Sequence, residues 1–202
     1  MALIDKKDIR VDAPDERDGI KIDKGAVITQ DELEKNFDLF TKVFDQFKWY
    51  PDLFIDLITP KESKFKLLPY QRIFLRGCMR FRYNYVCACR AFSKSFLSVL
   101  AEYLRCILFP GSKVFICSPG KEQSIKIAIE KITEIWDLFP ILEKEIISKN
   151  FQTANVRLVF RNGSVFDIVS ASDAQRGGRR HSGIIDEVRD HDGDSLNKIV
   201  LP

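Results

Sequence analysis

The sequence predicts an α/β domain built on a mostly parallel sheet, and the order of its apolar segments is the main reason. Short strand-like runs alternate with segments of helical periodicity in the order 83–89, 94–109, 113–117, 121–138 and 182–185. Strands joined through helical crossovers pair in parallel, so this order favours a sheet flanked by helices. A β-hairpin insertion is expected at 156–169, because Asn162-Gly163 between two apolar runs is a strong hairpin signal.

The two ends of the chain differ in character. Residues 1–60 are expected to form an N-terminal arm and a helical segment, and residues 61–202 the α/β core. Charged side chains are frequent over 1–30, which is typical of an arm that orders on a partner. From Thr29 a helix of about 15–20 residues is predicted to end before Pro51, and a second helix covers 69–82. The apolar stripe expected to face the core on the first helix is Leu33, Phe37, Phe40, Phe44 and Phe47.

Composition narrows the class of protein. With 202 residues and 45% hydrophobic content, the chain can bury the core of a domain. Its net charge of +3 excludes a protein that wraps a polyanion over most of its surface. The five cysteines form no C-x-x-C pair, which argues against a zinc site and favours a reducing compartment. The N-terminus is too charged for a signal peptide, and no run is apolar enough to span a membrane, so a soluble intracellular protein is expected.

A candidate phosphate-binding loop lies between the run 83–89 and the helical segment 94–109. A loop in this place directs backbone N–H groups and a helix N-terminus at one point. Lys94 would reach β- and γ-phosphate oxygens, and the Ser95 hydroxyl would ligate Mg²⁺. Phosphate loops usually have glycine one and six residues before the lysine, where this chain has Ser93 and Ala88. The alternative is a polar helix cap with an exposed lysine. The loop residues expected to bind nucleotide are Cys89, Arg90, Ala91, Phe92, Ser93, Lys94 and Ser95.

Two adjacent carboxylates, Asp186 and Glu187, follow the last strand-like run. An aspartate at such a strand end can hold the Mg²⁺ shell, and a neighbouring glutamate can polarise the attacking water. An isolated pair would be better explained as an acidic turn. Here it follows the Lys94 loop in the expected order, and both signals stand at the carboxyl ends of predicted strands, so together they indicate a nucleotide site.

A third signal stands upstream of the loop. Gln71 next to Tyr70 is expected to read adenine, because an amide both donates and accepts hydrogen bonds and an aromatic neighbour can pack on the base. The alternative is an ordinary helix start whose aromatic ring belongs to the core.

Together these motifs resemble the ATPase domain of the large terminase subunit, the P-loop NTPase (RecA/ASCE-like) motor that packages DNA in tailed phages. Such domains carry a glycine-poor Walker A loop with an early arginine, similar to 89–95. They also have a segment like 170–180 before a Walker B strand that ends in Asp-Glu, and a hairpin like 156–169. The resemblance covers about residues 67–188.

The resemblance implies a role for each matched residue. Lys94 and Ser95 would bind phosphate and metal, Asp186 would hold Mg²⁺ and Glu187 would be the catalytic carboxylate. Arg90 would lie over the γ-phosphate as a second catalytic residue. The arginines implied at a subunit interface or on DNA are Arg176, Arg179 and Arg180.

The resemblance also implies partners. ATP and Mg²⁺ are the expected cofactors, and the partners are double-stranded DNA bound without sequence preference, the portal protein, the small terminase subunit and further copies of this chain. The motor would act in the host cytoplasm, docked on the procapsid. Terminases continue beyond this point with a coupling motif and a nuclease domain. We therefore expect a fragment, or one half of a split gene product, without nuclease activity.

Residues 61–94 combine many basic side chains with interleaved aromatic ones. They predict either non-specific contact with DNA phosphates or a solvated helix face with its aromatic rings in the core. Two further functional interpretations stay open. One is a fragment of a superfamily-two helicase or translocase. The other is a degenerate, non-catalytic P-loop module used in assembly, which Ser93 and Ala88 favour.

Overall fold

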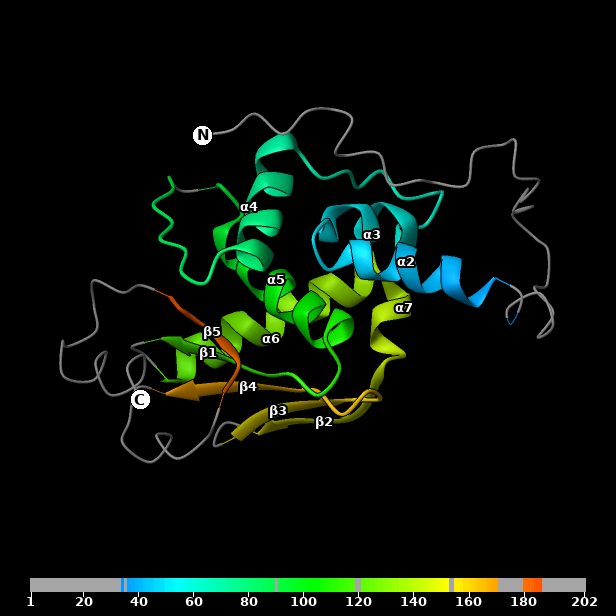
Figure 1. Ribbon diagram of the computed structural model, residues 1–202. Helices are drawn as coiled ribbons and strands as arrows, with labels where there is room; N and C mark the ends of the chain where they lie inside the picture. Colours follow the sequence, from blue (N-terminus) through cyan, green and yellow to red (C-terminus); the bar gives the residue numbers. More distant parts are fainter. Residues whose placement is uncertain are drawn as a thin grey trace.

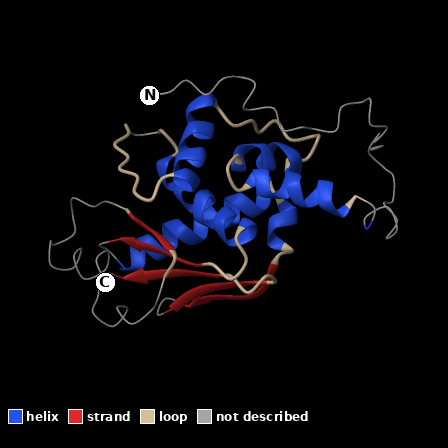
Figure 2. Cartoon of the chain, viewed as in Figure 1, coloured by secondary structure: helices blue, strands red, loops and turns tan. Residues whose placement is uncertain are grey.

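The computed structural model describes residues 34, 36–89, 91–118, 121–152, 155–170 and 180–186. Within this part of the chain, the helices form one layer and the strands form another (Figures 1 and 2). The described helices lie on one side of the sheet in this view. The predicted α/β class is therefore confirmed. No described helix has both the length and the apolar content needed to cross a membrane.

The helices that the sequence pattern predicts best are those with strong periodicity. The predicted helices at 69–82, 94–109 and 121–138 all form, and each ends within two residues of its predicted end. The pattern does not predict α3 and α7. The first helix ends before Pro51 as predicted, and Pro51 also begins α3, because proline at the first helical position loses no hydrogen bond. The helices are α2 (Phe37–Phe47), α3 (Pro51–Ile58), α4 (Pro69–Arg80), α5 (Lys94–Leu108), α6 (Lys121–Leu138) and α7 (Pro140–Glu143).

The sheet has five strands in the order β2-β3-β4-β1-β5. β1 pairs in parallel with β4 and with β5, whereas β3 pairs antiparallel with β2 and with β4. The sheet is mixed, and the expectation of a mostly parallel sheet is wrong. The reason is that the predicted hairpin joins the sheet as β3 and β4, and β2 extends it on the antiparallel side. The strands are β1 (Lys113–Ser118), β2 (Ile146–Gln152), β3 (Asn155–Phe160), β4 (Val165–Ser170) and β5 (Ser182–Ile185).

The segment 83–89 differs most from its expected structure. It has no regular secondary structure, and the side chain of Tyr85 is 88% exposed. The predicted strand before the phosphate loop is therefore wrong for this structure. Its residues suit a pleated surface, but a strand also needs a neighbour for its backbone hydrogen bonds, and none of the described strands pairs with it.

The core lies between the helices and the sheet. Alternate residues of the central strands point toward the helices and are buried, as the two-residue period of a strand requires. The largest fully buried side chains of the helical layer include Leu97, Leu100 and Leu104, so α5 is its central member.

The predicted apolar stripe of the first helix is only partly in the core. Phe47 is buried, but Phe37 is 61% exposed and Phe44 is 39% exposed, while Leu33 and the side chain of Phe40 lie outside the described residues. The cause is the position of α2, which projects from the helical layer and meets α3 mainly through its last turn (Figure 1).

Candidate nucleotide-binding site

The backbone of the candidate phosphate loop has an unusual conformation. Ala91 has a φ of +66° and Ser93 a φ of +61°, and no other described non-glycine residue has a positive φ. The left-handed region is unfavourable for residues with a Cβ and is normally filled by glycine. Ser93 stands where a Walker A loop has glycine. The loop therefore takes a glycine-type conformation at this position although the residue is serine.

The start of α5 is open to an anion. Ser93 is the N-cap, yet its side chain makes no capping hydrogen bond, and the first turn carries no acidic residue. The first intrahelical bond runs from Leu97 N–H to the Ser93 carbonyl at 2.9 Å. Lys94 and Ser95 are half-buried in this first turn. Amide groups at a helix start attract anions, and the adjacent lysine adds a positive charge.

The structure brings the upstream motif to the loop. The Tyr70 ring on α4 packs against the Phe92 ring, with centroids 4.5 Å apart and an angle of 36° between the planes. The two segments are separated by most of α4 and by the irregular segment 83–89, so their contact is a product of the fold. The motif predicted to read adenine and the predicted phosphate loop are neighbours.

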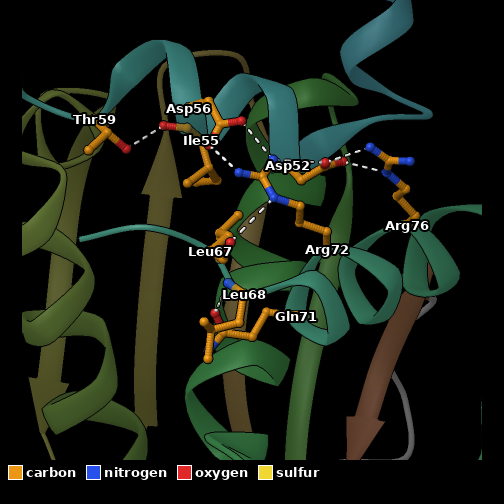
Figure 3. Close-up of polar contacts among 9 residues, drawn as sticks. All are labelled: Asp52, Ile55, Asp56, Thr59, Leu67, Leu68, Gln71, Arg72 and Arg76. Atoms are coloured by element: carbon orange, nitrogen blue, oxygen red, sulfur yellow. Dashed lines mark hydrogen bonds and ion pairs between the residues drawn. The ribbon is translucent and has the colours of Figure 1, made fainter. Parts of the chain in front are cut away.

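Gln71 has a structural partner. Its side chain is buried, and its Oε1 accepts a hydrogen bond from the Leu68 backbone N–H at 2.8 Å (Figure 3). This bond caps the N-terminus of α4. An amide oxygen can accept two hydrogen bonds, so Gln71 can keep this cap and still accept one from an adenine amino group. Its role toward adenine stays a prediction.

Asp186 directly follows β5 and lies at the end of the sheet where α5 begins. Its backbone N–H donates to the Cys117 carbonyl at 2.9 Å, which holds it beside the last residues of β1. After α5 the chain reverses through the short turn 109–112 and enters β1, so β1 ends on the side where α5 starts. β5 is parallel to β1. Lys94, Ser95 and Asp186 therefore belong to the same end of the layered fold.

Several predicted site residues lie outside the described residues: Arg90, Arg176, Arg179 and Glu187. Cys89 is described and exposed. Arg180 is described as well, and it has partners inside the chain. Its guanidinium pairs with the buried Asp167 and lies 6.0 Å from the centre of the Phe115 ring. Its predicted place at an interface or on DNA stays a prediction.

Sequence reasoning missed a row of side chains on the sheet face that points away from the helices. Asp167 is buried there and accepts a hydrogen bond from Arg157 Nε at 2.7 Å. On the neighbouring strand β1, Phe115 is the register partner of Asp167, and on β5 Gly183 is the register partner of Phe115. A Cβ on Gly183 would lie 2.1 Å from Cε1 of Phe115, so any other residue at this position would have to displace the ring. The signal in the sequence that could have predicted this row is the aspartate within an otherwise apolar strand. A buried carboxylate needs a partner, so a basic side chain is expected beside it.

The predicted basic surface is partly internal. Arg72 donates to Asp56 at 2.6 and 2.8 Å and to Asp52 at 3.2 Å, and Arg76 donates twice to Asp52 at 2.7 Å (Figure 3). Hydrogen bonds to these carboxylates raise the pKa of both arginines. Arg80 lies 4.6 Å over the Tyr50 ring. These three arginines hold α4 against α3 and its preceding turn. They are therefore engaged within the chain, which neither predicted role of the basic segment, DNA contact or a solvated helix face, describes.

The donor set suits magnesium. Among the described residues, no group of three His, Cys, Asp or Glu side chains is arranged to hold a metal ion. Mg²⁺ does not require such a group, because it keeps several waters and takes one or two protein oxygens together with substrate phosphates. The Ser95 hydroxyl and the Asp186 carboxylate are oxygen donors of this kind.

Comparison with known proteins does not assign a family. No family model matches the chain, and no curated protein is significantly similar to it.

Proposed function

We propose that this chain is the ATP-binding and ATP-hydrolysing motor domain of a P-loop NTPase, and that it acts as a viral terminase large subunit that drives double-stranded DNA into a procapsid. The observation that carries the proposal is the left-handed Ser93 directly before Lys94 at the open start of α5. Backbone strain of about 1–3 kcal/mol persists where the surrounding structure imposes it, and such positions cluster at ligand-binding sites.

In this proposal each part of the site has a separate task. Lys94 and the first amides of α5 bind the phosphates, and Tyr70 with Gln71 forms the adenine side. Ser95 and Asp186 would hold Mg²⁺, which neutralises phosphate charge when it is bound. Glu187 accepts the proton of the attacking water, and Arg90 stabilises the charge that develops on the γ-phosphate.

The assignment to DNA packaging, with the portal protein, the small terminase subunit and further copies of the chain as partners, rests on the order of the motifs and on the hairpin. Exposed lysines in the loop before α4 support DNA contact without sequence preference, since they are available to phosphates. These lysines are Lys61, Lys64 and Lys66.

A second candidate is a non-catalytic P-loop module used in assembly. The observation that favours it is the irregular segment 83–89, because the loop is not anchored on a strand within the described part of the chain. Mg²⁺-dependent ATP turnover separates the two candidates. If the chain is a motor, Glu187→Gln is expected to retain ATP binding and lose turnover. If it is an assembly module, the wild type itself is expected to show no turnover.

The phosphate loop is tested by calorimetric titration of the protein with ATP and Mg²⁺. Lys94→Ala removes the charge that reaches the phosphates and is expected to weaken binding at least about 100-fold. Lys66→Ala, which removes an exposed lysine outside the loop, is the matched control and is expected to bind as the wild type does. Equal affinity of the wild type and Lys94→Ala would contradict the proposal.

The conformation of Ser93 gives a second test of the same site. Ser93→Gly accepts a positive φ without strain and is expected to retain the affinity for Mg²⁺-ATP. Ser93→Val places a β-branched residue in the left-handed region and is expected to weaken binding about tenfold or more. Comparable binding by both variants would show that the left-handed loop is not what binds the phosphates.

A further inference from the structure

Glu102 is a buried acidic residue in the middle of α5, about two helical turns beyond Lys94. Only 5% of the residue is exposed. Its Oε1 accepts a hydrogen bond from the Ser182 hydroxyl of β5 at 2.7 Å. Its Oε2 is buried, and none of the described residues donates a hydrogen bond to it. The nearest cation to that oxygen is Arg105, whose Nε lies 3.8 Å away.

Arg105 extends these contacts to a third element. Its Nη2 donates to the backbone carbonyl of Cys78, near the end of α4, at 2.6 Å. A continuous polar chain therefore runs from Cys78 on α4 through Arg105 and Glu102 on α5 to Ser182 on β5. We call these four residues the α4–α5–β5 contact chain.

The three elements joined by this chain are the ones that carry the candidate site. The first turn of α4 carries Tyr70 and Gln71, α5 begins with Lys94 and Ser95, and β5 is followed by Asp186. The contact chain is made of other residues of the same three elements. It connects the elements further along their lengths, where a small shift would change how the three site ends face one another.

We propose that Glu102 is a positioning residue, and that the α4–α5–β5 contact chain sets the relative position of the three elements and thereby the geometry of the nucleotide site. The part that concerns nucleotide rests on the proposed function. For stability alone, an apolar residue would suit this position better, because burying a carboxyl without full hydrogen bonding is unfavourable. An apolar residue, however, would provide no directional contact with β5 and Arg105.

Ser182→Ala tests the chain at its far end. Without the Ser182 hydroxyl, Glu102 has Arg105 as its nearest remaining partner, and drawing Arg105 toward the carboxylate takes it from the Cys78 carbonyl. Amide hydrogen exchange of the nucleotide-free protein is expected to become about tenfold faster in β5 and about twofold faster at the end of α4, where the effect is smaller because no hydrogen bond joins Arg105 to Glu102. Faster exchange confined to β5 would overturn the proposal, because the contacts would then be independent.

Tyr103→Phe is the matched control for general destabilisation. Tyr103 is the next residue on α5 and is fully buried, and its hydroxyl bonds to the Leu142 carbonyl and the Trp136 ring nitrogen, each at 2.9 Å. The variant loses buried hydrogen bonds on the side of α6 and α7. Its exchange is expected to change there, with β5 and the end of α4 as in the wild type. Faster exchange at the end of α4 in this control would contradict a specific contact chain.

The positioning role is measured as affinity for Mg²⁺-ATP, at a temperature where every variant is folded. Ser182→Ala and Glu102→Leu are expected to bind about tenfold more weakly than the wild type. Glu102→Gln keeps an oxygen for Ser182 but turns an NH2 group toward Arg105, so its affinity is expected to lie between those of the wild type and Glu102→Leu. Tyr103→Phe leaves the chain intact and is expected to bind as the wild type does. Equal affinity of Ser182→Ala and Tyr103→Phe would refute positioning. If the wild type itself does not bind, the proposed function fails, while the exchange experiment still decides whether the contact chain exists.

Discussion

Asp52 and Glu102 are both buried acids in the helical layer, but they are held in different ways. Asp52 is fully buried, and its two carboxylate oxygens accept hydrogen bonds from Arg72 and Arg76. Glu102 receives one hydrogen bond, from Ser182, within the described part of the chain, and its second oxygen receives none there. Arg105, its nearest cation, donates to a backbone carbonyl instead.

The difference shows two ways in which a fold accommodates a buried acid. Around Asp52, opposite charges on α4 compensate the carboxylate, so that its charge joins α3 to α4 (Figure 3). Around Glu102, compensation is incomplete. Burial raises the pKa of Glu102 above its ordinary value of 4.5, and this effect exceeds the lowering by the Ser182 hydrogen bond and by Arg105. The arrangement around Asp52 stabilises the pair of helices α3 and α4. The arrangement around Glu102 leaves a carboxyl group whose pKa depends on Ser182 and Arg105.

The largest effect is expected from Asp52→Ala. The variant removes the shared partner of two arginines, and we expect the free energy of unfolding to fall by about 3 kcal/mol. Asp56→Ala is the control, because Asp56 is half-exposed and contacts only Arg72 of these two arginines; its expected effect is about 0.5 kcal/mol. Urea unfolding measures both. Equal losses would show that the buried aspartate is no more important than the exposed one.

A smaller effect is expected in the pairwise coupling of each acid with its nearest arginine. A double-mutant cycle on Asp52 and Arg76 should give a coupling energy of about 1–2 kcal/mol, since two short hydrogen bonds join them. The cycle on Glu102 and Arg105 should give less than about 0.5 kcal/mol, because no hydrogen bond joins them. Similar coupling in the two cycles would remove the distinction between the two acids.

The smallest effect is a pH dependence. Glu102 faces Arg105 and Cys106 on its own helix, Cys78 on α4 and Ser182 on β5. Because its pKa is raised on folding, the folded state binds more protons than the unfolded state above pH 4.5, and stability falls as the pH rises through the folded pKa. Glu102→Gln has no such ionisation. We expect the two proteins to be similarly stable at pH 4 and the variant to gain relative stability as the pH rises.

That comparison of stability curves is made by urea unfolding at a series of pH values. A constant difference between the wild type and Glu102→Gln from pH 4 to pH 8 would contradict a raised pKa of Glu102. It would leave the Asp52 predictions intact, since the Asp52 contacts join different elements.

The elements with local signals could be predicted from the residues alone. The start and end of α4, α5 and α6 follow from helical periodicity with proline and glycine breaks, and the β3–β4 hairpin follows from Asn162-Gly163. The motifs at 89–95 and at Asp186 were also readable, because each is a short run of residue types at a predicted element boundary.

The segment with which each element pairs or packs depends on the folded chain and could not be predicted from local patterns. The apolar run 83–89 is not part of the sheet, whereas β2, which was not predicted, is one of its edge strands. Phe37 is exposed on a helix that projects from the core. From the sequence, Arg72 and Arg76 are candidate phosphate contacts, but in the fold both donate hydrogen bonds to Asp52 of α3. Glu102 and Ser182 are far apart in the sequence and are brought into contact by the fold. Backbone preference and hydrophobic period act over a few residues, whereas strand pairing and charge compensation depend on groups far apart in the chain.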